Sequence, residues 1–442
     1  MNDRIHFIGI GGIGVSSLAQ YYLAKGFKVS GSDISFSEII EFLKRKGIKI
    51  SIGQKKENIS KDISLVIFTP AIQSSNPELK EAKRLRIKTK SYSEALGELN
   101  KSYFTIAVSG AHGKSTTTGM LANVLIQAGL DPTVVIGTKL KEFGNTNFRM
   151  GKDKGVLLVE ADEFKESFLN YRPKIIITTN IEPEHLDYYK NLPNILKAFS
   201  KFTSFLKKDG IFICNKDNEN VLKIAKKQEK IGKVIYYSLK QKEREMIKKV
   251  LKIPGEHNIS NALAVLSCAR ALKIKDSVTL KGLASYTGAW RRMETRIIKL
   301  KNRKVTIISD YGHHPTEIDL TVSAIKEKYA GKKIWLIFQP HQYQRTYYLF
   351  NDFIRVLSKL DLDNLVLAPI YEVAGRETKL LKQKVSSKKI SEELNKKGEK
   401  TISFPTLKNV KKYIEDSFKG DVIIFMGAGD IYFLADQMVQ GE

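Results

Sequence analysis

Short apolar runs alternate along the chain with longer stretches that fit helices. In the first hundred residues we predict strands at 5–10, 27–31, 65–69 and 87–91, and helices at 15–25, 37–46 and 77–86. Regular alternation of strands and helices is typical of a parallel sheet covered by helices. The N-terminal part of the chain is therefore expected to be an α/β domain.

The alternation continues to the end of the chain. Further strands are predicted at 104–108, 155–159, 174–179, 305–309, 334–338, 365–368 and 422–426. A length of 442 residues leaves room for about three domains. We predict an α/β protein with a Rossmann-like N-terminal domain at 1–99, a central P-loop-type ATPase domain at 100–295 and a Rossmann-like C-terminal domain at 296–442.

The segment SGAHGKSTTT, residues 109–118, has the layout of a nucleotide-phosphate loop, with a strand before it and a helix predicted at 116–128. Lys114 adds a positive charge against the β- and γ-phosphates, and the Ser115 hydroxyl can bind Mg²⁺. The glycines lie closer together than in the usual P-loop, and a Gly-Lys-Ser triplet also arises by chance in a lysine-rich chain. The flanking strand and helix favour an ATP-binding loop, which we assign to Gly110, Ala111, His112, Gly113, Lys114, Ser115 and Thr116.

An earlier glycine-rich turn, GIGGIG at 9–14, links the first strand to the first helix. Gly11, Gly12 and Gly14 fit a turn that binds a nucleotide diphosphate, and Asp33 ends the next strand, where a ribose would lie. The alternative is that these glycines serve only a tight turn. A dehydrogenase needs only this first site and an ATPase only the second. An enzyme that uses ATP on a nucleotide-linked substrate needs both.

Polar residues also follow the other central strands. Glu160 comes directly after the strand at 155–159, where an acid in the sheet of a phosphate loop is placed to hold Mg²⁺. His185 follows the strand at 174–179, which suggests a metal or phosphate role, although Mg²⁺ prefers oxygen ligands. Asn258 and Asn261 begin a helix predicted at 262–272, where they either read an adenine edge or cap the helix.

In the last third, candidate residues again follow strand ends, where open α/β sheets bind ligands. Arg292 precedes a change in composition and could bridge to nucleotide phosphates when the next domain closes. Asp310 ends a strand, and three histidines occur in two neighbouring motifs: His313, His314 and His341.

Composition narrows the class of protein. The net charge is +27, from 74 basic and 47 acidic residues, but the lysines are spread over the whole length without a nucleic-acid-binding motif. We therefore expect a solvated lysine-rich surface, which suits an anionic substrate, and no nucleic-acid partner. No apolar run is long enough for membrane insertion, and no leader is recognisable. Cys214 and Cys268 fit buried free thiols, so we expect a cytoplasmic protein. We separately expect a monomer or a weak homodimer.

The motifs occur in a familiar order. GIGGIGVSSLA, SGAHGKSTTT, VEADE, TNIEPEHLDYY, PGEHNISNAL and WRRMET together resemble the Mur ligase family, the ATP-dependent amide-forming enzymes of peptidoglycan precursor synthesis. DYGHHPTE, FQPHQYQRT and MGAGDIYFLADQ look like the branch that adds L-alanine to UDP-N-acetylmuramate. The resemblance implies that ATP and Mg²⁺ are required, that an acyl phosphate forms on the muramyl carboxylate, and that domain closure excludes water.

The resemblance also implies residue roles. The catalytic residues would be Lys114, His185, Arg292 and His314. Mg²⁺ would be held by Ser115, Glu160 and His185. Asn258 and Asn261 would lie at the adenine, and Arg292 and Asp310 at the ATP phosphates and ribose. The diphosphate and uridine of the UDP-sugar would lie at Gly11, Gly12, Gly14 and Asp33, and the incoming alanine or the nucleotide phosphate at His341 and Arg345.

Several positions depart from the family pattern. Ser115 stands where the family usually has Thr, and Phe164-Lys165 follows VEADE in place of Ser-Asp. Gln342 replaces the Arg that usually follows QPH, which removes one positive charge. Neither Lys197 nor Lys201 is assigned the carbamylated-lysine role found in sister ligases.

Three other functions are compatible with parts of this sequence. A muropeptide-recycling ligase of the same family would join a preformed peptide to UDP-N-acetylmuramate. A lysine-rich nucleic-acid-binding ATPase would explain the charge and the phosphate loop, but a recognition motif is missing. A nicotinamide dehydrogenase would leave the second phosphate loop unexplained.

Overall fold

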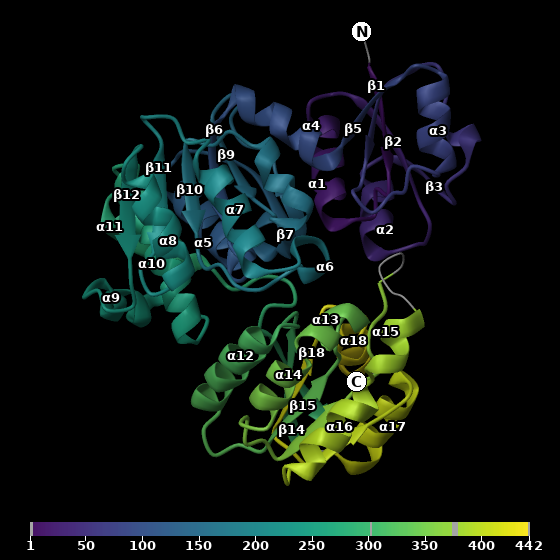
Figure 1. Ribbon diagram of the computed structural model, residues 1–442, viewed down its shortest axis with the longest axis vertical. Coiled ribbons are helices and arrows are strands. Elements are labelled where there is room, and N and C mark those ends of the chain that lie inside the picture. Colours follow the sequence, from purple (N-terminus) through teal and green to yellow (C-terminus); the bar gives the residue numbers. More distant parts are fainter. Residues whose placement is uncertain (1–2, 301–302, 374–378, 441–442) are drawn as a thin grey trace. The chain divides into compact units, whose positions relative to one another are not determined.

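A computed structural model describes residues 3–300, 303–373 and 379–440 and contains three β-sheets with helices packed against them (Figure 1). The chain divides into two compact units. The first unit comprises Met1–Pro183, Asn191–Val250 and Ser260–Thr287. The second comprises Glu184–Lys190, Leu251–Ile259 and Gly288–Glu442.

The N-terminal sheet belongs to the first unit and is parallel throughout. Its described strands are β1 (Arg4–Ile8), β2 (Lys28–Asp33), β3 (Lys49–Ile52), β4 (Ile63–Phe68) and β5 (Lys88–Ser91), in the order β3-β2-β1-β4-β5. This is the strand order of a dinucleotide-binding fold, as predicted. Its helices are α1 (Ile13–Ala24), α2 (Glu38–Arg45), α3 (Pro77–Arg84) and α4 (Tyr92–Leu99).

The central sheet also belongs to the first unit. Its described strands are β6 (Phe104–Ser109), β7 (Thr133–Leu140), β8 (Thr146–Arg149), β9 (Val156–Glu160), β10 (Ile175–Thr178), β11 (Ile211–Asn215) and β12 (Lys233–Tyr237). The order β12-β11-β10-β6-β9-β7-β8 makes β10, β6 and β9 neighbours. The polar motifs that follow these three strands therefore lie at one edge of the sheet.

Most of the helices that follow the central strands belong to the first unit, and two group wholly or partly with the second. They are α5 (Lys114–Gln127), α6 (Leu186–Tyr189), α7 (Leu192–Thr203), α8 (Glu219–Gln228), α9 (Glu243–Val250), α10 (Glu256–Ala271) and α11 (Asp276–Ser285). Of these, α6 and the first turn of α10 group with the second unit.

The second unit contains the C-terminal sheet. Its described strands are β13 (Glu294–Leu300), β14 (Arg303–Asp310), β15 (Ile334–Phe338), β16 (Asn364–Leu367), β17 (Thr401–Ser403) and β18 (Val422–Met426), in the order β13-β14-β18-β15-β16-β17. Its helices are α12 (Pro315–Lys328), α13 (Tyr343–Tyr348), α14 (Phe350–Leu357), α15 (Lys379–Lys384), α16 (Ser387–Lys396), α17 (Leu407–Ser417) and α18 (Tyr432–Gln440).

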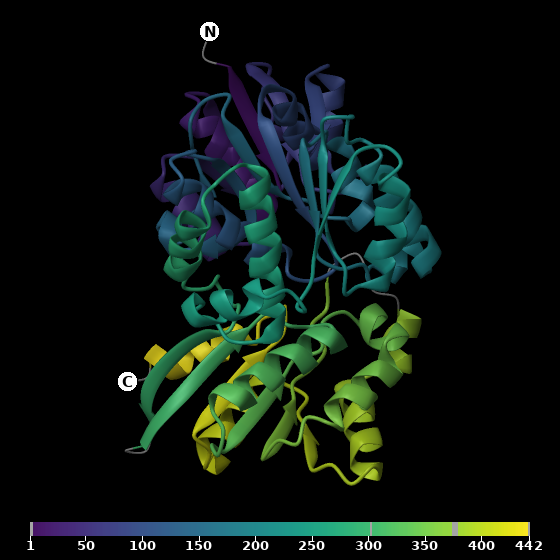
Figure 2. The ribbon, with the colours of Figure 1, turned by 90° about the vertical axis from the view of Figure 1, so that its left-hand side faces the viewer.

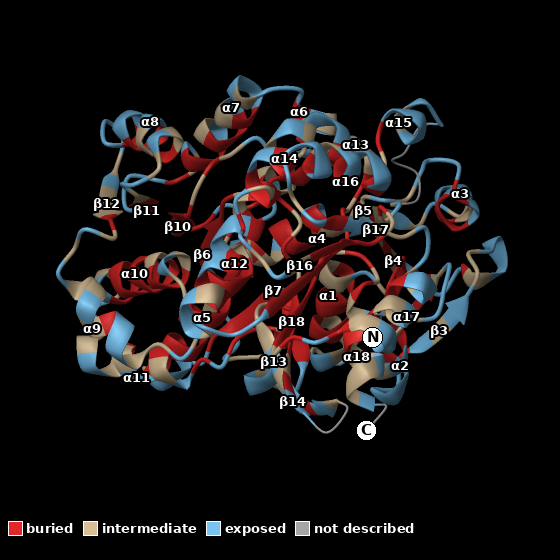
Figure 3. Cartoon of the chain, turned by 90° about the horizontal axis from the view of Figure 1, so that it is seen from below, coloured by how far each residue is buried: buried red, intermediate tan, exposed pale blue. Residues whose placement is uncertain are grey.

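The inner strands are buried on both faces, which explains their uninterrupted apolar sequences. Every residue of β15 and of β18 is buried, and separate apolar clusters pack on the two faces of their sheet. Figure 3 shows the strands mostly buried, with exposed outer faces on the helices. In the described part of the chain, no helix is both long enough and apolar enough to cross a lipid bilayer.

The structure differs from the sequence-based expectation at several elements, and the strands that were not predicted are β3, β7, β8, β11, β12, β13 and β17. The second and third sheets each end in an antiparallel strand, β8 and β13, and Figure 2 shows the long β13–β14 hairpin at the edge of its sheet. Helix α10 begins at Glu256 instead of residue 262, because Gly255 (φ +101°) makes the turn before it and Glu256 places an acid in the first turn.

Candidate active site

The phosphate loop connects β6 to α5 and depends on two glycines in left-handed conformations. Gly110 has φ +135° and Gly113, which caps α5, has φ +81°. A Cβ atom would lie 2.1 Å from the Thr179 hydroxyl oxygen at Gly110 and 2.5 Å from Asn261 Oδ1 at Gly113. Glycine is therefore required at both positions. Because glycine has no side chain to cap a helix, the first N–H groups of α5, including that of Thr116, suit an anion.

The end of β10 holds this loop in place. The His112 N–H donates to Asn180 Oδ1 (2.8 Å), and Asn180 Nδ2 donates back to the His112 carbonyl (3.0 Å). The Thr179 hydroxyl donates to the same carbonyl (2.6 Å), and Ala111 N–H donates to the Asn180 carbonyl (3.2 Å). His112 thus contributes its backbone to loop order. Asn180 belongs to the TNIEPEHLDYY motif, but no role was predicted for it from the sequence.

Lys114 is paired with an acid that the sequence argument did not select. Its Nζ lies 2.9 and 3.1 Å from the two carboxylate oxygens of Glu163 and also donates to the Gly110 carbonyl. Burial lowers the pKa of Lys114, but Glu163, Asp162 and Glu160 outweigh it, so the net effect is a raised pKa. Lys114 is therefore a charged group at the loop, and a phosphate has to compete with Glu163 for it.

Ser115, in the first turn of α5, lies against Glu160, the last residue of β9. The Ser115 hydroxyl lies 3.0 Å from each carboxylate oxygen of Glu160, and the Gly137 N–H donates to Glu160 Oε2 (2.8 Å). Ligand oxygens at about 2.1 Å from an octahedral Mg²⁺ lie about 3 Å apart. The hydroxyl and the carboxylate therefore fit two adjacent positions around this ion.

The glycine-rich turn of the first sheet is held by the end of β2. The Gly9 and Ile10 N–H groups donate to the Ser32 carbonyl (2.8 and 3.1 Å), and the Gly11 N–H donates to Asp33 Oδ2 (2.8 Å). Asp33 therefore lies at the turn, as a nucleotide site requires, and contacts it directly. Gly12 precedes α1 as its N-cap, and a Cβ atom at Gly14 would lie 3.1 Å from the Tyr92 ring.

The two asparagines of the PGEHNISNAL motif lie inside α10 and are buried. Asn258 Nδ2 donates to the Pro254 carbonyl (2.6 Å), and the Asn261 amide lies against Gly113 of the phosphate loop. Neither residue is the N-cap of the helix, because α10 begins at Glu256.

In the second unit, a buried ion pair joins the segment before α6 to α13. Arg345 donates through Nη2 (2.7 Å) and Nε (3.2 Å) to Glu184 Oε1, and through Nη1 to the His341 carbonyl (3.1 Å). Burial raises the pKa of Glu184, but Arg345 and the neighbouring His185 lower it more, so this pKa is well below its usual value. The next residue, His185, has φ +54° and precedes α6.

The histidines of the two C-terminal motifs lie close together. The His341 ring stacks on Tyr371 (centroids 5.4 Å apart) and meets the His313 ring at 5.7 Å. Burial and Arg345 lower the pKa of His313 to about 3, so it is neutral at physiological pH. His314 caps α12 by accepting a hydrogen bond at Nδ1 from the Thr316 N–H (3.3 Å).

Arg292 lies just before β13 and Asp310 ends β14, so in this antiparallel pair both lie at the end where β13 begins. The Arg292 guanidinium lies 5.1 Å from the Tyr311 ring centre and 3.4 Å from Glu317 Oε1. Asp310 accepts from the Gly312 and Met293 N–H groups (2.7 and 2.8 Å), and burial raises its pKa.

Two of the positions that depart from the family pattern, Lys165 and Gln342, have positive φ angles. Lys165 has φ +51° and interrupts a short 3-10 helix, and its Nζ donates to the Pro70 carbonyl (3.2 Å). Gln342 has φ +71° and is buried, and its N–H donates to the Tyr371 carbonyl (2.9 Å). Phe164 is also buried.

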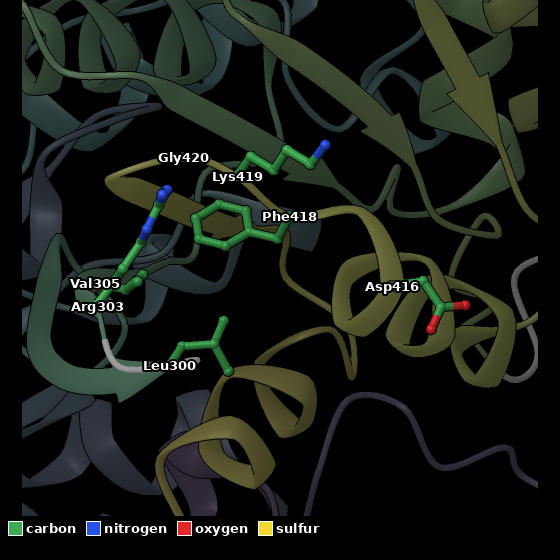
Figure 4. A pocket seen from close by; sticks show the side chains of 7 residues that line it. All are labelled: Leu300, Arg303, Val305, Asp416, Phe418, Lys419 and Gly420. Atoms are coloured by element: carbon green, nitrogen blue, oxygen red, sulfur yellow. The ribbon is translucent and has the colours of Figure 1, made fainter.

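A separate pocket of about 290 Å³ contains none of these residues. It lies at the amino ends of β14 and β18, opposite the strand ends that carry the motifs, and Figure 4 shows Arg303, Phe418 and Lys419 among its lining side chains. We therefore do not assign it to the active site.

Comparison with known proteins identifies the family of the chain. Three family models match in order: "Mur ligase family, catalytic domain" at 4–104, "Mur ligase middle domain" at 108–269 and "Mur ligase, glutamate ligase domain" at 291–429. The UDP-N-acetylmuramate–L-alanine ligase of Clostridium botulinum strain Langeland is 39% identical over 460 residues, covering 99% of this chain and 98% of the relative. That of Clostridium kluyveri is 39% identical over 454 residues, covering 98% and 96%.

Solved structures give the same result. The chain matches the UDP-N-acetylmuramate–alanine ligase of Thermotoga maritima with TM-score 0.82 and 28% identity, covering 99% of this chain and 98% of that one. A murein peptide ligase of Psychrobacter arcticus matches with TM-score 0.72 at 22% identity, which shows the fold alone. The three family models that match along the chain, together with 39% identity to a relative over 99% of the chain, show that the chain belongs to the Mur ligase family.

Proposed function

We propose that the protein joins L-alanine to the lactyl carboxylate of UDP-N-acetylmuramate, using ATP, in peptidoglycan precursor synthesis. The products are UDP-N-acetylmuramoyl-L-alanine, ADP and phosphate. The observation that carries this proposal is the 39% identity with an L-alanine-adding ligase over 99% of the chain. The presence of two separate phosphate-type turns supports it, because the reaction uses ATP on a nucleotide-linked substrate.

ATP activates the carboxylate as an acyl phosphate, and the alanine amine then displaces phosphate through a tetrahedral intermediate. The reaction concentrates negative charge, so positioned cations and N–H donors supply most of the rate. Lys114 exchanges its contact with Glu163 for the β- and γ-phosphates, while the loop from Gly110 to Thr116 presents N–H groups. Ser115 and Glu160 hold Mg²⁺, which offsets phosphate charge when bound.

The second unit supplies the remaining groups in this proposal. His185 contributes to the metal site and His314 and Arg292 to catalysis. Asn258 and Asn261 lie at the adenine, and Asp310 at the ribose. His341 and Arg345 order the amino-acid side of the reaction. The Glu184–Arg345 pair supports this last role because it fixes the guanidinium against the His341 carbonyl.

The UDP part of the substrate binds at the first sheet. Gly11, Gly12 and Gly14 lie at the diphosphate, and Asp33 lies at the uridine. The contact between Asp33 and the Gly11 N–H supports a single preformed site there. We place the reaction in the cytoplasm, where ATP and the nucleotide sugar are available.

Phosphate release by the purified protein tests this function. We expect release only when ATP, Mg²⁺, UDP-N-acetylmuramate and L-alanine are all present. Equal release without the amino acid would contradict the proposal. A parallel reaction with the tripeptide L-alanyl-γ-D-glutamyl-meso-diaminopimelate in place of alanine tests the recycling alternative, since faster use of the tripeptide would favour it. Stimulation by DNA or RNA would favour a nucleic-acid-dependent ATPase instead.

A further inference from the structure

A carboxylate lies fully buried beneath the glycine-rich turn of the first sheet. Glu78, in the first turn of α3, has no exposed surface. Its Oε2 accepts a hydrogen bond from the Ser32 hydroxyl (2.5 Å), and its Oε1 accepts one from Asn58 Nδ2. His6 Nε2 lies 3.8 Å from Oε2. Glu78 therefore joins β1, the end of β2, the 3-10 turn at Lys56–Asn58 and α3.

The end of β2 that Glu78 contacts is also the support of the glycine-rich turn. The Ser32 carbonyl accepts from the Gly9 and Ile10 N–H groups, and the adjacent Asp33 carboxylate accepts from the Gly11 N–H. Gly9 has φ +76°, and a Cβ atom there would lie 2.5 Å from the Thr69 side chain. Glycine is therefore required at position 9. The hydrogen bonds to Ser32 and Asp33 hold the turn against the end of β2.

Burying a carboxylate is costly unless hydrogen bonds compensate, and an apolar side chain would fill the same space at lower cost. Here the two hydrogen bonds come from Ser32 on β2 and Asn58 on the 3-10 turn, and Ser32 also holds the glycine-rich turn through its carbonyl. Hydrogen bonds are directional, so the Glu78 carboxylate fixes the orientation of the Ser32 and Asn58 side chains, which apolar packing would not do.

We infer that Glu78 is a positioning residue for the nucleotide-diphosphate site. It fixes Ser32 and Asp33 at the end of β2, so that Gly9–Gly12 keeps the conformation that accepts a uridine diphosphate. This inference rests on the proposed function of that turn. Glu78 does not contact substrate and acts only through Ser32 and Asp33.

Titration calorimetry with UDP as the probe, on the full chain, tests this role. Glu78→Gln keeps the size of the side chain but replaces one acceptor with a donor that faces Ser32 or Asn58. We expect its Kd for UDP to rise about tenfold, while its Kd for ADP stays within about twofold of wild type. Glu57→Gln removes an exposed carboxylate from the same domain and is the matched control, with both Kd values unchanged.

Ser32→Ala tests the same contact from its other partner. It deletes the hydroxyl that donates to Glu78 but leaves the carbonyl that holds the turn, and we expect the same selective loss of UDP binding. In the double variant the two losses of UDP affinity should not add, because both substitutions break the same Ser32–Glu78 hydrogen bond. If Glu78→Gln does not fold, Ser32→Ala alone decides.

Normal UDP binding by either folded variant, or fully additive losses, would overturn the inference. A fall in UDP and ADP affinity together would also overturn it, since that indicates general destabilisation. Failure of the proposed function is distinguishable, because the wild-type protein would then not bind UDP.

Discussion

At the scale of single residues, the Ser115 hydroxyl and Glu160 carboxylate lie 3.0 Å apart and should act as one metal site. Ser115→Ala removes one oxygen ligand, and we expect the Mg²⁺ concentration for half-maximal phosphate release to rise roughly 10- to 100-fold. Ser115→Thr keeps a hydroxyl and is the control, with a near wild-type requirement. A Ser115→Ala enzyme with an unchanged Mg²⁺ requirement would show that the hydroxyl is not a ligand.

His313 should make stability depend on pH. Its native pKa of about 3 lies below the ordinary value of 6.5, so the unfolded chain takes up a proton between these values and the native protein does not. The free energy of unfolding therefore falls as the pH is lowered from 6.5 towards 3. At pH 5 the loss from this residue is about 2 kcal/mol.

The measurement is the unfolding temperature of wild type and His313→Asn by calorimetry between pH 8 and pH 5. We expect the variant to lose less stability on acidification than wild type, because it lacks this proton uptake. Parallel curves for the two proteins would show that His313 titrates normally in the folded state.

The sequence predicted the residues whose chemistry is encoded in a local motif. Lys114, Ser115 and Glu160 could be selected because each follows a strand or a glycine turn at a typical spacing. Glu163 and Glu78 could not, because their roles depend on contacts with residues 49 and 46 positions away. The VEADE motif placed Glu163 near the site, but only the fold shows that it pairs with Lys114.

At the scale of elements, the two ends of α5 offer a matched test of the phosphate loop. Gly113 before the helix and Gly129 after it both have positive φ, +81° and +74°. Alanine strains either position by about 1 kcal/mol. Only at Gly113 would the new Cβ atom also meet Asn261, because nothing lies within 4 Å of the one at Gly129.

We therefore expect Gly113→Ala to raise the KM for ATP at least about tenfold, while Gly129→Ala lowers only the unfolding temperature. Steady-state kinetics with ATP as the varied substrate, together with thermal unfolding of both variants, separates the two effects. Equal KM values in the two variants would mean that the loop tolerates a side chain at Gly113.

Continuous apolar runs made several buried strands predictable, although β7 and β11, which are also largely buried, were not predicted. β6, β9, β10, β15 and β18 were found because they are nearly continuous apolar runs. β13 was missed because, as an edge strand, it alternates exposed residues with partly buried ones and carries charged residues on both faces, so it is not a continuous apolar run. β8 was missed because four residues, TNFR, carry too short a pattern.

At the scale of the whole molecule, the three sheets explain why three family models match one after another along the chain. The α/β alternation predicted that architecture from the chain alone. It did not predict that Glu184–Lys190, inside the central motif TNIEPEHLDYY, groups with the C-terminal sheet. Within that unit the Glu184–Arg345 ion pair joins positions 161 residues apart, a contact that no local motif encodes.

The separation of the glycine-rich turn and the phosphate loop into two sheets gives a prediction about the whole enzyme. Lys114→Ala removes the charge that we propose contacts the ATP phosphates, and it removes the partner of Glu163 in their ion pair, but it changes no residue of the N-terminal sheet. Phosphate release should fall by at least about a hundredfold, as for loss of one preorganised donor in a polar site. The Kd for UDP-N-acetylmuramate, measured by calorimetry without ATP, should stay within about twofold of wild type.

Lys101→Ala, at an exposed lysine just before β6, is the control for a general loss of charge. Loss of sugar-nucleotide affinity together with turnover would mean that the two sites are not separate and that the boundary we predict near residue 99 is wrong.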